Sequence, residues 1–165
     1  MRWPQNVALM GFTLAISTQV FSTLTFAQLP PLHGVRDVSI SVSRAGAPKP
    51  DACRPTDDEL EASVKYVLAN SPIRVSPTPV SKAKLDVTYN FVAASDTQMC
   101  AYHVSISIWI PADVRAPNIS GKFAVLLFQV ENMGMAGSSE VGNAVTRMTE
   151  QLAKHFVVKW SEQNQ

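Results

Sequence analysis

Apolar and polar residues alternate strictly over several stretches of the chain, which is the pattern of strands with one buried face. The longest such stretch covers residues 100–110. Its apolar face consists of Cys100, Tyr102, Val104, Ile106, Ile108 and Ile110, and its other face of Ala101, His103, Ser105, Ser107 and Trp109. Shorter stretches at 35–42 and 85–91 predict two more strands, and 73–75 is a candidate edge piece. Because 85–91 and 100–110 are joined by a short polar segment, they predict an antiparallel hairpin.

Residues 122–131 form a stretch that is apolar on both faces. Strict alternation places Phe123, Val125 and Leu127 on one side and Ala124, Leu126, Phe128 and Val130 on the other. A strand of this kind is either covered twice or contributes to a contact surface. The flanking segments contain proline or glycine, so we expect a turn region over 111–121 and a flexible link over 132–138.

Two helices are predicted from capping signals and from apolar spacings of three and four. Thr56 and Glu59 form a capping box for a helix that runs to about Asn70 and is stopped by Pro72. A second apolar stripe runs from Val141 to Trp160, with Ser138 or Ser139 as the expected cap.

The resulting order of elements is β-α-β-β-β-α. The most economical packing places both helices on the apolar face of one sheet. The predicted fold class is therefore α+β, a two-layer sandwich with an antiparallel-rich sheet of about four strands and both helices on one face.

The first 27 residues have the order of regions of a secretory signal peptide. Arg2 is followed by an uncharged apolar run over 7–26, and Ala27 supplies a small residue at the cleavage position. We expect removal of 1–27, which leaves residues 28–165 as a single exported domain in the periplasm or outside the cell. A retained membrane anchor is the alternative, because about 20 apolar residues can span a bilayer.

The two cysteines of the chain agree with export, since paired cysteines are typical of exported proteins. A bridge between Cys53 and Cys100 would close a loop of about 48 residues and stabilise the fold by about 4 kcal/mol in the chain-entropy model. Without Arg2 the chain has 13 basic and 13 acidic side chains. This neutral balance gives no electrostatic reason to expect nucleic acid or an anionic membrane as partner.

The residue patterns do not predict an enzyme. Cys100 and His103 fall on opposite faces of their strand, and a zinc site would need more ligands. His103 and Ser105 share a face, but nothing nearby indicates the oxyanion donors of a nucleophilic site. Helix capping accounts for the acidic cluster over 57–61. We therefore predict no catalytic residue, no cofactor and no metal ligand.

Methionines offer one alternative to that prediction. Met133 and Met135, with Met99 and His103, have the soft donor atoms that suit Cu(I). Methionines beside a glycine in a link are more often packing residues, so we expect those at 133 and 135 to contact the core.

The remaining candidate is a contact surface, made of Trp109, Leu126, Phe128 and Val130 if the alternation is strict. We accordingly expect a non-catalytic binding or accessory protein of the cell envelope, with a protein partner of unknown identity in the envelope or outside the cell. A homodimer through the 122–131 strand would use the same surface. Two alternatives are a secreted inhibitor or host-facing effector that uses the exposed segment 71–84, and a metal-handling protein or enzyme built on His103, Met133 and Met135.

Overall fold

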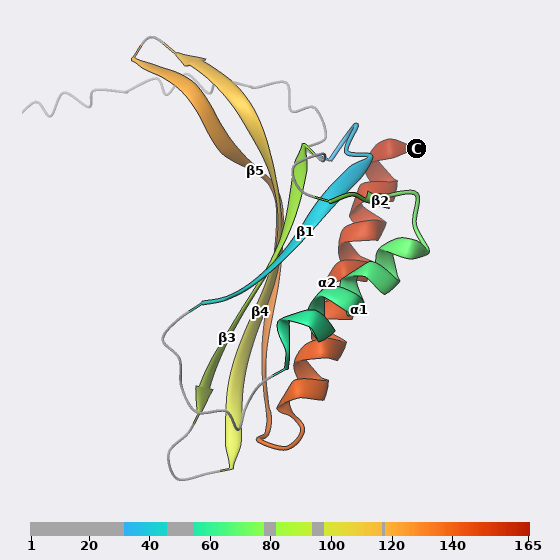
Figure 1. Ribbon diagram of the computed structural model, residues 1–165, viewed down its shortest axis with the longest axis vertical. Helices are drawn as coiled ribbons and strands as arrows, with labels where there is room; N and C mark the ends of the chain where they lie inside the picture. Colours follow the sequence, from blue (N-terminus) through green and yellow to red (C-terminus); the bar gives the residue numbers. More distant parts are fainter. Residues whose placement is uncertain (1–31, 46–54, 78–81, 94–97, 117) are drawn as a thin grey trace, which may run out of the picture.

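The structure, a computed structural model, describes residues 32–45, 55–77, 82–93, 98–116 and 118–165. In chain order the elements are β1 (Asp37–Arg44), α1 (Asp57–Ala69), β2 (Arg74–Val75), β3 (Ala83–Ala93), β4 (Met99–Ala116), β5 (Ile119–Gly137) and α2 (Val141–Asn164). The strands form one sheet, and α1 and α2 lie side by side on the same face of it (Figure 1). The predicted α+β class is confirmed. The predicted signal peptide, 1–27, lies outside the described residues.

The sheet is mixed, with the strand order β2-β1-β3-β4-β5 among the described residues. β1 pairs in parallel with both β2 and β3, whereas β3–β4 and β4–β5 are antiparallel. The expected antiparallel-rich sheet of about four strands is wrong in this respect. After β1, helix α1 carries the chain back to the start of the sheet. For this reason β2 and β3 run in the same direction as β1. Alternation of side chains identifies a strand but does not give its direction.

The core lies between the helices and the inner face of the sheet, which is the face toward α1 and α2. The central strands contribute buried residues at every second position, for example Val87 on β3 and Ile106 on β4. The capping box of α1 is confirmed: the Glu59 amide donates to Thr56 Oγ1 over 3.2 Å, and the Thr56 amide donates to Glu59 Oε2 over 3.0 Å. The N-cap of α2 is Glu140, so the expected serine cap is wrong.

β4 and β5 are longer than the sequence pattern predicts, because Pro111 and Gly134 both lie inside strands. Pairing between β3 and β4 ends at Trp109, so Pro111 follows where β4 no longer has β3 beside it, and a proline is tolerated there. Gly134 pairs with Tyr102, whose ring lies across it. The expected turn over 111–121 and link over 132–138 are therefore wrong in most of their length.

We expect Gly134→Ala to lower the free energy of unfolding by about 1–3 kcal/mol, the usual cost of overpacking. An added Cβ would lie 2.6 Å from Tyr102 Oη and 2.7 Å from Cζ, so the buried ring has to move. Urea denaturation followed by circular dichroism measures the change. Gly137→Ala is the matched control, because its Cβ would come no closer than 3.8 Å to the nearest contact, the carbonyl oxygen of Gln98. Equal losses in the two variants would contradict the role of the Tyr102 ring.

Candidate functional site

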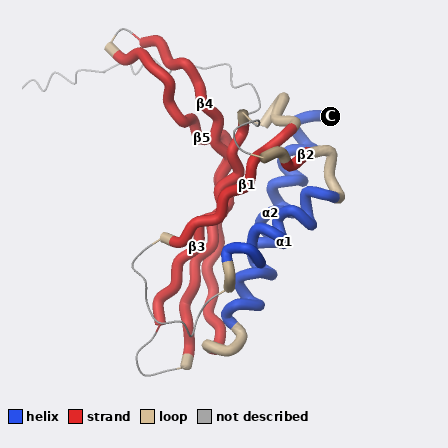
Figure 2. The backbone as a smooth tube through the Cα atoms, in the orientation of Figure 1, coloured by secondary structure: helices blue, strands red, loops and turns tan. Residues whose placement is uncertain are grey.

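The far ends of β4 and β5 extend beyond the rest of the sheet as a two-stranded ribbon. This part, residues 110–116 and 118–125, is called the β4–β5 arm below. β4 and β5 remain paired up to Ala116 opposite Ile119, although β3 no longer lies beside β4 in this part. The arm projects past the ends of the other strands and curves away from the helix layer (Figures 1 and 2). It therefore presents both of its faces beyond the packed core.

A β-bulge lies at the base of the arm. Ile108 pairs with Phe128, and its neighbour Trp109 pairs with Leu126, so Leu127 is an additional residue on β5. A bulge reverses the alternation of faces beyond it. As a result Phe123 and Val125 of the arm lie on the same face as Phe128 and Val130. The apparent second apolar face of this stretch results from the bulge.

The bulge divides the predicted contact surface. Trp109 and Leu126 form a cross-strand pair on the outer face of the sheet, away from the helices. The Trp109 ring is half-buried, and its indole N–H donates to Ser107 Oγ over 2.9 Å. Phe128 and Val130 instead pack against the core. The expectation that all four residues share one face is wrong, because strict alternation has no place for an additional residue.

The opposite faces of Leu126 and Phe128, two side chains of β5 separated only by Leu127, can be tested by substitution. Phe128→Ala is expected to cost about 2–4 kcal/mol of folding stability, because the ring packs against Phe156 with centroids 5.6 Å apart. Leu126→Ala is expected to cost less than about 0.5 kcal/mol, because that side chain is exposed. Chemical denaturation of both variants measures the difference. A larger loss for Leu126→Ala would show that the register across the bulge is incorrect.

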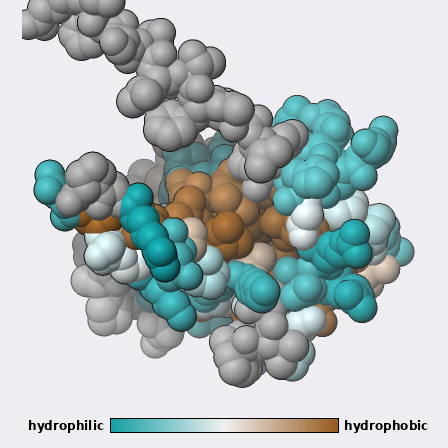
Figure 3. Space-filling model, turned by 90° about the horizontal axis from the view of Figure 1, so that it is seen from above, coloured by the Kyte–Doolittle hydropathy of each residue, from teal (hydrophilic) through white to brown (hydrophobic). Residues whose placement is uncertain are grey.

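The arm carries exposed hydrophobic side chains. Ile119 and Phe123 of the arm, and Leu126 at its base, are among the large apolar residues that the fold leaves accessible. Figure 3 looks down on the molecule from above and shows hydrophobic side chains gathered at its centre, with hydrophilic ones around them. Exposed apolar side chains are typical of contact sites; here Ile119 and Phe123 lie on one face of the ribbon and Leu126 lies on the other.

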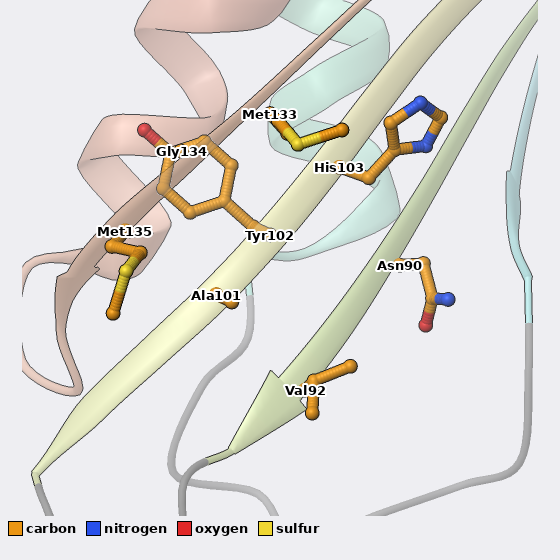
Figure 4. Close-up of a pocket in the computed structure, with 8 residues that line it drawn as sticks. All are labelled: Asn90, Val92, Ala101, Tyr102, His103, Met133, Gly134 and Met135. Atoms are coloured by element: carbon orange, nitrogen blue, oxygen red, sulfur yellow. The ribbon is translucent and has the colours of Figure 1, made fainter.

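A second feature lies on the outer face at the opposite end of β4 and β5. It is a hollow of ≈ 420 Å³ lined in part by Asn90, Val92, Ala101, His103, Met133 and Met135 (Figure 4). His103 Nε2 lies 3.4 Å from Glu131 Oε2. The sequence offered Met133, Met135 and His103 as an alternative metal site but placed the methionines in a link that contacts the core. That expectation is wrong, because β5 continues through them to Gly137 and both side chains are exposed.

The side chains that the sequence offers as candidates for catalysis do not come together in one site. Cys100 is buried on the inner face and His103 lies on the outer face, as the strand pattern predicts. Asp57, at the start of α1, accepts a hydrogen bond from the Tyr89 hydroxyl. Within the described part of the chain, no three His, Cys, Asp or Glu side chains group as a metal site would require.

Cys53 lies outside the described residues, so its bridge to Cys100 stays a prediction. None of the helices in the described ranges is long and apolar enough to cross a membrane.

No protein-family model and no curated protein sequence matches the chain. Among solved structures it resembles the PelC dodecamer from Paraburkholderia phytofirmans, at 11% identity and a TM-score of 0.48, over 78% of this chain and 91% of that one. A variant of that dodecamer gives 11% and 0.47, over 75% and 87%. A protein from Xanthomonas campestris, described as DUF330, gives 12% and 0.44, over 83% and 91%. At such identities, with TM-scores below 0.5, the likeness assigns neither a function nor a partner to this chain.

Proposed function

We propose that this protein is a non-catalytic binding and assembly module of the cell envelope, periplasmic or secreted, and that two copies join through the edge of β5 over residues 122–131. One observation carries the proposal. β5 is 19 residues long, is the last strand of the described sheet, and carries exposed apolar side chains near that edge. The signal-peptide pattern of residues 1–27 supports export.

An open strand edge is a template for another strand. The outward N–H and C=O groups of an edge strand are free to pair with a second chain, and proteins commonly protect such edges with short strands, prolines or charges. Over 123–130 the strand has no proline and no charged residue. Only Lys122 and Glu131, at the two ends of this segment, are charged. The edge is therefore suited to pairing with a strand of complementary pattern.

The pattern of β5 is complementary to itself. In a two-fold antiparallel pairing centred between Leu126 and Leu127, Lys122 of each copy faces Glu131 of the other. The same register places Phe123 opposite Val130 and Val125 opposite Phe128. Each of these pairs lies on one face, because the bulge at Leu127 has already shifted the alternation. Opposite charges thus meet on the outer face and apolar side chains on the inner face.

A charge-exchange cycle tests this register. Lys122→Glu and Glu131→Lys, each alone, replace two attractive pairs by two repulsive ones, and each is expected to weaken self-association about tenfold. The double exchange restores opposite charges and should return the dissociation constant to near the wild-type value. Sedimentation velocity over a range of protein concentrations measures all four proteins.

Lys154→Glu on α2 is the matched control, because it makes the same change of charge at an exposed site away from β5. It should leave the dissociation constant unchanged. If the double exchange is as weak as the single ones, or if the control weakens association equally, the proposed register is wrong. Circular dichroism of every variant separates lost assembly from lost folding.

A further inference from the structure

Methionines cluster on the outer face of the sheet, at the end away from the arm. Outside the predicted signal peptide the chain has four methionines, and three of them are in this place: Met99, Met133 and Met135. Their exposed fractions are 36%, 74% and 66%. Methionine is more often buried, so three exposed ones within two neighbouring strands call for an explanation.

The strand register joins His103 to this cluster. His103 is the cross-strand partner of Met133, and Met135 follows on the same face opposite Ala101. Directly paired side chains have Cβ atoms about 4.5–5.5 Å apart, and the three rotatable bonds of methionine let its sulfur reach across such a distance. Figure 4 shows the end of the Met133 side chain beside the His103 ring. The small side chain of Ala101 leaves space between His103 and Met135.

We propose that this cluster binds a soft monovalent cation, Cu(I), through the thioether sulfurs of Met133 and Met135 and an imidazole nitrogen of His103. Neutral sulfur and imidazole ligands select Cu(I) over hard cations. Glu131 lies 3.4 Å from His103 Nε2, so its carboxylate can accept the proton of that nitrogen and leave Nδ1 as the unprotonated nitrogen for the metal. Met99 lies on the same face of β4, two residues before Ala101, but it is not among the residues that line the hollow.

The sulfur ligands of this site lie outside the proposed pairing segment, and Glu131 is the residue that the two proposals share. Pairing of two copies uses the edge of β5 over 122–131, whereas the sulfurs belong to the outer face at 133 and 135. A surface for hydrophobic docking would show the same exposed methionines, but it would tolerate leucine. Replacement of methionine by leucine keeps the size and hydrophobicity and removes the sulfur, so it separates the two explanations.

The test uses the purified exported protein in its oxidised form, so that cysteine thiols do not compete. Isothermal titration with Ag(I), a redox-stable substitute for Cu(I), and competition for Cu(I) with bathocuproine disulfonate measure binding. We expect one equivalent per chain, and a loss of affinity of at least about tenfold both in Met133→Leu/Met135→Leu and in His103→Asn.

Met148→Leu on α2 is the matched control, because Met148 is partly buried against the core and lies outside the cluster. It should bind as the wild-type protein does. In ¹³C-methyl spectra, the Met133 and Met135 resonances should shift on addition of Ag(I) while that of Met148 stays in place. Absence of Ag(I) binding by the wild-type protein, or unchanged affinity in the Met133→Leu/Met135→Leu variant, would overturn the site.

Discussion

Replacing Phe156 by alanine is expected to lower the free energy of unfolding by about 3–5 kcal/mol, close to half the stability of an ordinary domain. Phe156 is fully buried in α2, and its ring packs against Phe128 of β5. This contact holds the last helix against the strand at the base of the arm. Removal of the ring leaves a cavity, because the sheet and the helix can move together only partly to fill it. Urea denaturation followed by far-ultraviolet circular dichroism measures the loss.

Val158→Ala, two residues further along α2, is the control for this experiment. Its side chain is exposed, so the expected loss is below about 0.5 kcal/mol. If Phe156→Ala were as mild as Val158→Ala, the face of α2 that packs on the sheet would be incorrectly assigned. A smaller m-value, the slope of unfolding free energy against urea concentration, with an unchanged midpoint would also contradict a simple cavity effect.

Loss of the predicted Cys53–Cys100 bridge is the second large effect, about 4 kcal/mol in the chain-entropy model. Cys100 begins the apolar face of β4 and is buried there, so a bridge from it would tie this strand to the segment that precedes α1. Cys53→Ser removes the bridge without placing a hydroxyl at position 100. The midpoint of urea denaturation should fall in this variant and, by the same amount, in the wild-type protein treated with reductant.

Mass spectrometry of the exported protein provides the decisive control for the bridge. Because Cys100 is buried, the protein is denatured before alkylation; without reduction both cysteines should stay unmodified, and after reduction both should be modified. If both thiols react without reductant, the bridge is absent. Cys53→Ser should then be no less stable than the oxidised wild-type protein.

Much of the fold can be predicted from patterns formed by residues that are close together in the sequence. The capping box at Thr56 and Glu59 fixes the start of α1, and spacings of three and four select the buried side of α2. The inner face of β4 is also predictable, since Val104, Ile106 and Ile108 alternate with polar residues and are all buried. Each of these features is decided by side chains close together in sequence.

The features that escaped prediction depend on contacts across the sheet. Leu127 looks like any other apolar residue, and only its pairing with β4 shows the bulge. Gly134 resembles a chain breaker until the Tyr102 ring is seen across it, and this one error hid the continuation of β5 through Met133 and Met135. The candidate sites depend on this pairing, so the sequence supplied their residues without their arrangement.

Hydrogen exchange of the β5 amides as a function of protein concentration tests the assembly through this strand most directly. In a dimer joined through 122–131, the outward amides of that segment become hydrogen-bonded and their exchange slows as the concentration passes the dissociation constant. The proposed pairing predicts slowing confined to this segment, and a shift of that slowing to about tenfold higher protein concentration in Lys122→Glu. Exchange rates in 122–131 that are independent of concentration, or protection that appears elsewhere while the protein dimerises, would contradict it.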